Sequence, residues 1–402
     1  MIRIAPHIDV TLASPYGTGG IAPKRVVWHG MHTLAEGTCR DTGAALLASL
    51  PSGHGSLNDY VLDLNARKVF CPAAVLPWFG RPMLESMLAP SPDEVPFRVE
   101  TFAPAKRAVI LNTIDYLYGH ALLKLLNAER HLEQHPDTPL VVIVQDFLRW
   151  MVPAGAAEVW TVSLPLSKAQ RYHPKLHDRI EAECRRFDEV FLSRAHSHPA
   201  VSDITRFTGE ARHDRTAEPY RITFIWRDDR PWVSNRYLVA AAKRLGLLGT
   251  LRWRQRQKVV SLFERLRETL PNARFTVAGF GRSLEFPEWI DDQRVTTFTR
   301  EAEERLCTVY AESRVVVGVH GSNMLLPSAH AGITVDLMPE ERWGNLAQDV
   351  IFQETDPRMA VFRYRFLPIS LRSGLLARII ATQLAEERNF AQQMVVNAGG
   401  TA

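Results

Sequence analysis

The sequence predicts an α/β protein with two domains, and three observations lead to this prediction. The chain has 402 residues, more than one ordinary domain usually holds. Apolar residues make up 46% and charged residues 23%, so each domain can bury a core of its own. Short, almost wholly apolar runs alternate with helical patterns, which is typical of a parallel sheet covered on both faces.

The second half of the chain shows this alternation most clearly. Apolar runs rich in β-branched residues predict strands, and apolar residues at helical spacing predict helices between them. The predicted strands are 222–226, 274–278, 295–298, 315–319 and 333–337, and the predicted helices are 259–270 and 301–313. Parallel sheets bind ligands at the carboxyl ends of their strands, so chemistry is expected in the loops that follow these strands.

The first half predicts a similar α/β pattern, so that two similar halves make up the chain. Its predicted strands are 25–28, 108–111, 140–144 and 189–192, and its predicted helices are 39–50 and 118–131. A polar stretch at 209–219 places the boundary between domains 1–215 and 216–370. The remaining segment, 371–402, contains an amphipathic helix that could pack back across the domains.

The strongest local motif is the turn His320–Gly321–Ser322–Asn323, which follows a predicted buried strand. Backbone N–H groups at the start of a following helix are unpaired and partly positive, so they suit a phosphate. Gly321 lets a ligand approach the backbone, and the three polar side chains can add hydrogen bonds. An ordinary tight turn with a capping serine is the alternative.

Two further loops follow strands of the same predicted sheet. Arg227 and Arg230 come directly after the first strand, with Asn235 beyond them, and a guanidinium there could pair with a diphosphate. The alternative is a surface loop in which two Asp residues neutralise the Arg residues. Gly279 and Gly281 end the next strand and permit close backbone approach, but taken alone this loose GxG pattern favours a simple turn.

The stretch 221–337 resembles the sugar-nucleotide half of glycosyltransferase family 61. Its turn 317–323 is similar to the family's Val–Gly–x–His–Gly–Ala–Gly-like turn, its segment 225–230 to the Arg-rich segment, and Glu340 follows the later strand. In the first half, Gly119–His120 resembles the opening of the family's Gly–His helix. The family has an Asp four residues after this His, whereas this chain has Lys124, so the family's His–Asp pair is not found at that spacing.

This resemblance implies a GT-B-like fold, with two Rossmann-like domains whose parallel sheets face each other across a cleft. It implies an inverting, metal-independent glycosyltransferase that needs no cofactor besides its co-substrate. A sugar would pass from a nucleotide-sugar donor in the second domain to a hydroxyl of a glycan or polysaccharide acceptor in the first. A non-catalytic nucleotide or sugar-phosphate binding protein of the same fold is the alternative.

Such a transfer needs a base for the acceptor hydroxyl and positive groups for the leaving diphosphate. Three base candidates remain open: His120 from the resemblance, His29 after a predicted strand, and Asp146 after another. The expected donor contacts lie in the second half and are Arg227, Arg230, Asn235, Gly279, Gly281, His320, Gly321, Ser322, Asn323 and Glu340.

Composition disfavours several other classes of protein. The net charge of +4, from 48 basic and 44 acidic residues, is scattered, and the run 252–258 is interpreted as a solvated helix end, so no nucleic-acid partner is expected. The four cysteines form no CxxC pair, which disfavours zinc and disulfides and favours a reducing, cytoplasmic location. No apolar run reaches about 20 residues, so at most peripheral membrane association is expected.

Overall fold

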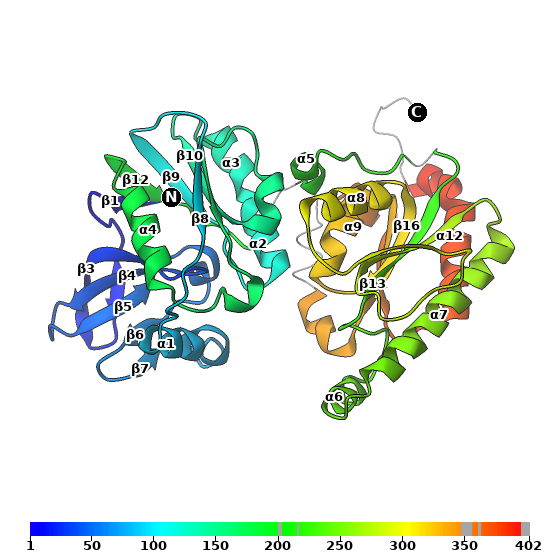
Figure 1. Cartoon of the computed structure of the whole chain (residues 1–402), viewed down its shortest axis with the longest axis horizontal. Coiled ribbons are helices and arrows are strands. Elements are labelled where there is room, and N and C mark those ends of the chain that lie inside the picture. The colour runs from blue at the N-terminus through cyan, green and yellow to red at the C-terminus, as the bar shows by residue number, and fades with distance from the viewer. Residues whose placement is uncertain (200–202, 215–216, 347–355, 361–362, 395–402) are drawn as a thin grey trace. The chain divides into compact units, whose positions relative to one another are not determined.

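The computed structural model describes residues 1–199, 203–214, 217–346, 356–360 and 363–394 (Figure 1). The chain divides into two compact units, Met1–Ser202 (unit 1) and Asp203–Ala402 (unit 2). The sequence-based boundary at 215/216 and the chain end beyond 394 lie outside the described residues. Both units combine helices with sheets that contain parallel strands, which confirms the predicted α/β class.

Unit 1 contains a six-stranded mixed sheet with four parallel strands at its centre. Its strand order is β1-β12-β9-β10-β11-β8, and only the edge strands β1 and β8 pair antiparallel to their neighbours. The central β9 and β10 are almost entirely buried because both faces of the sheet are covered. The bounds are β1 Ile2–Ala5, β8 Phe97–Thr101, β9 Arg107–Asn112, β10 Leu140–Gln145, β11 Glu158–Val162 and β12 Glu189–Leu192.

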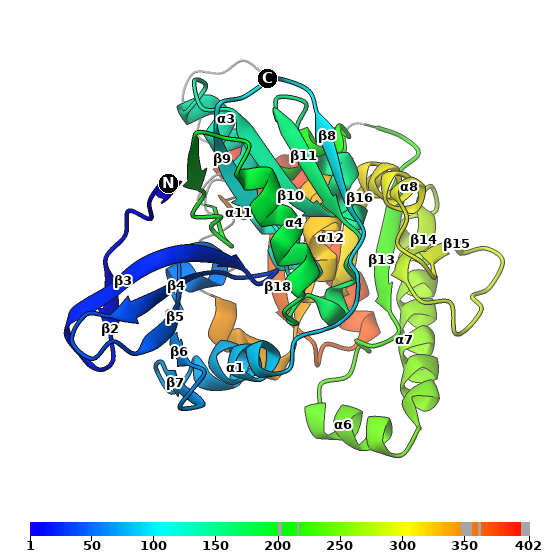
Figure 2. The ribbon, with the colours of Figure 1, turned by 60° about the vertical axis from the view of Figure 1, so that its left-hand side comes forward.

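Unit 1 also contains a second sheet, a six-stranded antiparallel meander in the order β2 to β7. Figure 2 shows these blue strands as a sheet separate from β8 to β11. The expectation of two similar halves is therefore wrong, since unit 2 has no such meander among its described residues. The strands are β2 Leu12–Ser14, β3 Gly17–Trp28, β4 Thr33–Cys39, β5 Ala45–Ser49, β6 Val61–Asp63 and β7 Lys68–Phe70.

The predicted helix 39–50 is wrong, because this segment contains the end of β4, a turn and β5. Gly43 in the turn has φ +73°, a conformation that favours glycine, and its N–H donates to the carbonyl of Cys39. Four of the five residues of β5 are buried, so the strand lacks the alternating polarity that would have revealed it.

The helices of unit 1 are short. The predicted helix 118–131 is observed as two consecutive helices, α2 and α3, that meet at Leu126. The elements are η1 Gly53–Ser56, η2 Leu76–Gly80, α1 Arg81–Leu88, α2 Tyr118–Leu125, α3 Asn127–Gln134, η3 Asp146–Met151, η4 Leu166–Lys168 and α4 Pro174–Cys184.

Unit 2 is built on one parallel sheet of six strands in the order β15-β14-β13-β16-β17-β18. Numbered along the chain, this order is 3-2-1-4-5-6, the strand order of a doubly wound sheet. The strands are β13 Arg221–Arg227, β14 Arg274–Phe280, β15 Asp291–Val295, β16 Ser313–Val319, β17 Ile333–Met338 and β18 Tyr364–Pro368. The switch in direction falls between β13 and β16, which is where such sheets bind ligands.

Sequence patterns located four strands of this sheet to within about two residues at each end. The fifth prediction, 295–298, is wrong, because β15 is an edge strand of mostly polar residues that ends where the prediction began. Polar composition hides an edge strand from any search for apolar runs.

Helices cover the sheet of unit 2 and complete its core. The C-terminal helix α12 packs against α7, and both contribute to one buried apolar cluster, for example through Phe263 and Ile380. The helices are α5 Ile204–Thr208, α6 Arg236–Arg244, α7 Leu248–Thr269, α8 Arg300–Ala311, η5 Ser322–Met324, α9 Leu325–His330, η6 Glu340–Asn345, α11 Pro357–Ala360 and α12 Ser373–Met394. Among the described residues, no helix combines the length and apolarity needed to cross a bilayer.

Candidate functional site

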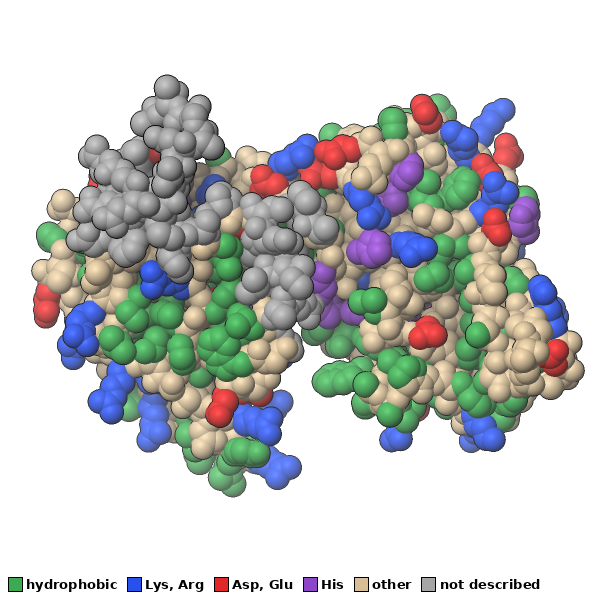
Figure 3. All heavy atoms as spheres, turned by 180° about the vertical axis from the view of Figure 1, so that it is seen from behind, with side chains coloured by type: hydrophobic (Ala, Val, Ile, Leu, Met, Phe, Trp, Pro, Cys, Tyr) green, Lys and Arg blue, Asp and Glu red, His purple; other side chains and the backbone are tan. Residues whose placement is uncertain are grey.

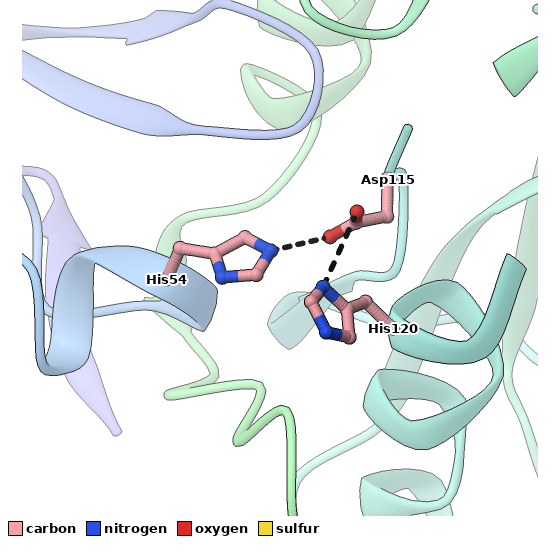
Figure 4. A group of neighbouring side chains, drawn as sticks. All are labelled: His54, Asp115 and His120. Carbon is pink, nitrogen blue, oxygen red and sulfur yellow. Dashed lines mark hydrogen bonds and ion pairs between the residues drawn. The ribbon is translucent and has the colours of Figure 1, made fainter. Parts of the chain in front are cut away.

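A buried carboxylate in unit 1 lies between two imidazole side chains (Figure 4) and beside a lysine ammonium. Asp115 is fully buried, and its Oδ2 lies 2.8 Å from Nε2 of His54, a hydrogen bond, and forms an ion pair with Nζ of Lys124 at 2.7 Å. Its Oδ1 accepts the N–H of Leu117 at 3.1 Å and faces Nδ1 of His120 at 3.8 Å. We call Asp115, His54, His120 and Lys124 the Asp115 cluster.

Local backbone features place each member of this cluster. Asp115 lies just past the carboxyl end of β9, and its N–H donates to Oε1 of Gln145 at the end of β10. His120 belongs to the first turn of α2. His54 lies between two glycines in η1, where Gly53 has φ +57° and its missing side chain leaves room for the Lys124 ammonium.

Only one member of the cluster reaches the surface to a useful extent. The side chain of His120 is 30% exposed, whereas those of His54, Asp115 and Lys124 are 6%, 0% and 1% exposed. A molecule arriving from solvent would therefore meet His120 first. Figure 3 shows histidine side chains gathered on one face of unit 1, so imidazoles are part of its accessible surface.

The electrostatics of the cluster keep Asp115 ionised and His120 neutral. Burial raises the pKa of Asp115, but the charge of Lys124 and the hydrogen bond from His54 outweigh it and hold the pKa below its ordinary value. Burial lowers the pKa of His120 to about 4, although the nearby Asp115 opposes this shift. At neutral pH His120 therefore carries a lone pair that can accept a proton.

The same side chains also have the composition of a metal site. His54, Asp115 and His120 offer ligand atoms within 4.8 Å of one another. However, the ammonium of Lys124 lies 2.7 Å from Asp115 Oδ2 and supplies the counter-charge that a metal ion would bring. A cation beside it would be repelled, so the cluster suits proton transfer better than metal binding.

The other two base candidates occupy different environments. His29 lies at the end of β3 but is fully buried, with Nε2 3.0 Å from Oγ of Ser86 and its ring stacked on Tyr172. Burial, with a smaller effect of His173, lowers the pKa of His29 to about 3. Asp146 opens η3 and is exposed. Only His120, among the three, joins partial exposure to a neighbouring buried carboxylate.

In unit 2 the predicted turn and the predicted Arg-rich loop come together at the switch point of the sheet. β13 ends at Arg227 and β16 ends just before His320, and these two strands are neighbours. Nη1 of Arg230 donates to the carbonyl oxygen of His320 at 2.9 Å and lies 3.4 Å from Oδ1 of Asn323. We call Arg230, His320, Gly321 and Asn323 the Arg230 turn.

Gly321 makes this contact sterically feasible. A Cβ atom at this position would lie 1.5 Å from Nη1 of Arg230, and the backbone has φ +146°. Nδ1 of His320 lies 3.1 Å from Oδ2 of Asp336, a buried residue of β17, which fixes the imidazole from behind. Nη2 and Nε of Arg230 have no hydrogen-bond partner within the described part of the chain, so they remain open to an anion.

The helix expected after the turn is present and, as predicted, is short. Ser322 opens the three-residue η5, and α9 adds only six residues, Leu325–His330. Such a short element carries a weak dipole, so any anion here would depend mainly on side chains.

Arg227, a predicted donor contact, is paired with an aspartate of its own loop. Its Nε and Nη2 donate to the two carboxylate oxygens of Asp229 at 2.8 and 2.9 Å. This bidentate pair agrees with the alternative interpretation of the loop, in which aspartates neutralise its arginines. The pKa of Arg230 is lowered by burial and then by the charges of Arg227 and Arg342, which the carboxylates of Asp229 and Asp336 oppose, so groups of both signs surround the turn.

Gly279, near the end of β14, and Gly281, just after it, have a structural role that needs no ligand. A Cβ on Gly279 would lie 2.4 Å from the carbonyl oxygen of Trp226, and one on Gly281 would lie 2.3 Å from Cγ of Asp228. Their φ angles are +109° and +106°, a conformation that favours glycine. They allow the ends of β13 and β14 to approach closely.

Asn235 and Glu340 lie at an open cavity of about 510 Å³ in unit 2, which Ser234, Arg236, Tyr237 and Glu341 also line. The side chain of Asn235 caps α6 by accepting the N–H groups of Tyr237 and Leu238 at 2.9 and 3.1 Å. Glu340 is exposed at the start of η6.

Sequence reasoning missed His54 and Asp115. The signal for Asp115 is a charged residue just after an apolar strand, and the signal for His54 is its position between two glycines. Comparisons of the chain with protein-family models, with curated proteins and with solved structures found no match in any of the three.

Proposed function

We propose that this protein is an inverting, metal-independent glycosyltransferase that transfers a sugar from a nucleotide-sugar donor to a hydroxyl of a saccharide acceptor. In the proposed GT-B arrangement, unit 2 binds the donor and unit 1 provides the base. The observation that carries the proposal is the guanidinium of Arg230 against the carbonyl of His320, at the carboxyl ends of neighbouring strands β13 and β16.

The Arg230 turn supports diphosphate binding for three reasons. It lies at the switch point of a doubly wound sheet, where such folds bind nucleotides. It offers the open Nε and Nη2 of Arg230, which match the forked geometry of two phosphate oxygens. Gly321 removes the side chain that would block the guanidinium.

The Asp115 cluster supports a base for the acceptor. Neutral His120 would take the proton from the attacking hydroxyl while that oxygen bonds to the anomeric carbon and the nucleoside diphosphate leaves with the bonding electron pair. Asp115, 3.8 Å from Nδ1 of His120, would stabilise the imidazolium that forms. Lys124 stands where glycosyltransferase family 61 has an Asp. His120 nevertheless has a neighbouring carboxylate, because Asp115 supplies one.

In the test of this proposal, the full-length protein is first screened by thermal shift against UDP-, GDP-, CMP- and dTDP-linked sugars. With the donor found, we expect His120→Ala to lower turnover about 10²- to 10⁴-fold, the usual range for loss of a general base. Calorimetry should give an unchanged donor Kd, because the substituted side chain belongs to unit 1 and not to the Arg230 turn.

Asp146→Asn is the matched control, because this exposed base candidate can be changed without disturbing a core. Its turnover should equal that of the wild-type protein. Full turnover in His120→Ala, or no stabilisation by any nucleotide sugar, would contradict the proposal.

A further inference from the structure

Helices α6 and α7 of unit 2 and the turn between them expose several large apolar side chains. Over 237–253, five such residues are exposed: Tyr237 at 71%, Leu238 at 41%, Leu245 at 70%, Leu247 at 52% and Trp253 at 52%. Figures 1 and 2 both show α6 projecting from the body of unit 2 beyond the end of α7. Soluble proteins rarely gather so many exposed apolar side chains without a binding role.

The stretch of sequence that forms this region carries charge of one sign only, whereas Glu340 and Glu341 of another segment line the cavity beside Arg236. From Pro231 to Phe263 the chain contains no Asp or Glu, and its basic residues are Arg236, Lys243, Arg244, Arg252, Arg254, Arg256 and Lys258. In Figure 3, green and blue side chains, with some red ones among them, lie over the lower end of unit 2. We call the segment Arg236–Arg254 the α6 corner.

Some of these basic side chains form hydrogen bonds within unit 2, and others extend into solvent. Arg252 donates to the carbonyl of Asp228 at 3.0 Å. Arg236 donates to Oη of Tyr237 at 3.1 Å, which raises the pKa of Arg236, and the charges of Glu341 and Glu340 act in the same direction. Lys243, Arg244 and Arg254 are exposed, and no ion pair or hydrogen bond within the described residues engages their side chains. Their charge is therefore available to an external anionic surface.

We propose that the α6 corner docks this protein on a membrane surface that contains anionic lipids. Leu, Trp and Tyr beside Lys and Arg are the composition of helices that lie in the bilayer interface. Tyr and Trp favour the headgroup region, and Lys and Arg favour anionic headgroups. The aliphatic Leu238, Leu245 and Leu247 suit acyl chains, whereas a nucleic acid would need aromatic stacking partners in their place.

The test is flotation of the full-length protein with vesicles of phosphatidylcholine alone or with 30% phosphatidylglycerol. We expect binding to the anionic vesicles that weakens as salt rises and little binding to the neutral ones. Each basic residue near an anionic surface contributes about fivefold to binding, so Lys243→Gln/Arg244→Gln should weaken it about 25-fold. Leu245→Ser/Leu247→Ser should weaken it by at least tenfold, because two apolar anchors are removed.

Two matched controls separate this corner from general surface charge and stickiness. Lys24→Gln/Lys106→Gln removes two exposed cations of unit 1, and Trp78→Ala removes a tryptophan that is 64% exposed there. Both controls should bind like wild type. Bromine-labelled lipids should quench wild-type fluorescence more than that of Trp253→Phe.

Absence of vesicle binding, or equal binding by the α6-corner variants and wild type, would overturn the proposal. Binding to a single-stranded oligonucleotide without binding to vesicles would overturn it in favour of a nucleic-acid surface. None of these measurements depends on a nucleotide sugar, so they succeed or fail independently of the proposed enzymatic activity.

Discussion

The two units contain the same pair of residue types in two different electrostatic settings. In unit 1, Asp115 contacts His54, lies near His120 and is balanced by the buried ammonium of Lys124. In unit 2, Asp336 holds His320 beside the partly exposed guanidinium of Arg230. The first setting leaves a neutral imidazole as a proton acceptor, and the second leaves positive charge facing outward, so an Asp–His contact alone does not define a role.

The units differ equally in how they use histidine. Eleven of the 14 histidines precede residue 203, and burial lowers the pKa of several of them, including His29, His120 and His131. Unit 2 instead places arginines around the end of its parallel sheet. We therefore expect acid to lower the stability of unit 1, and anions to bind to unit 2. The following predictions test this difference, beginning with the largest effect.

Asp115→Asn should have the largest effect, because it removes the counter-charge of buried Lys124. Breaking a buried ion pair costs about 3–5 kcal/mol of stability, measurable by urea unfolding. Turnover should fall by about the same factor as in His120→Ala, with donor affinity unchanged. The double variant Asp115→Asn/Lys124→Met should recover stability but not turnover. Recovery of turnover would show that the carboxylate does not act on His120.

The second prediction concerns acid. His29 has a folded pKa of about 3, below the ordinary 6.5, so the unfolded chain gains this proton first as pH falls. The stability of unit 1 is then lost progressively from about pH 6.5 toward pH 3, by about 1.4 kcal/mol per pH unit for this residue. His120 and His131, with pKa values of about 4, act in the same direction.

Urea unfolding at pH 7, 6 and 5, followed by hydrogen exchange corrected for intrinsic rates, can measure this loss separately in each unit. We expect β9 and β10 of unit 1 to lose protection before β16 and β17 of unit 2. His29→Gln should reduce the pH slope by about one proton. Equal acid sensitivity of both units would remove the proposed difference.

The third prediction separates two neighbouring arginines. Arg230→Met should weaken donor binding about 10- to 100-fold, because a hydrogen bond to a charged group contributes roughly 1.5–3 kcal/mol. Arg227→Met should change it by less than about threefold, because Asp229 already occupies that guanidinium. Calorimetry on both variants would decide, and the reverse order of effects would contradict the assignment.

The smallest effect is expected for Asn235→Ala. This substitution removes the cap of α6 and should cost about 1 kcal/mol in thermal or urea unfolding. Asn235→Ser, which can still cap the helix, should restore most of that loss. A large fall in donor affinity that Asn235→Ser does not restore would instead make Asn235 a ligand contact.

The sequence by itself determined the α/β class, most strands of unit 2 and the loops that follow them. Strands such as 315–319 and 333–337 are apolar throughout because both sides are buried, and that pattern is visible without a structure. Prediction from sequence patterns failed at β5, where a buried strand shows no alternation, and at β15, where an edge strand is polar.

Only the tertiary structure decided which side chains meet. His54 and Asp115 are 61 residues apart, and Arg230 and His320 are 90 apart, so no local pattern could pair them. In the sequence, Lys124 suggests that His120 has lost its carboxylate partner. In the fold, Asp115, just past the end of β9, supplies a carboxylate beside His120. Periodicity reports whether a residue is buried, while contacts across a sheet depend on strand order and register.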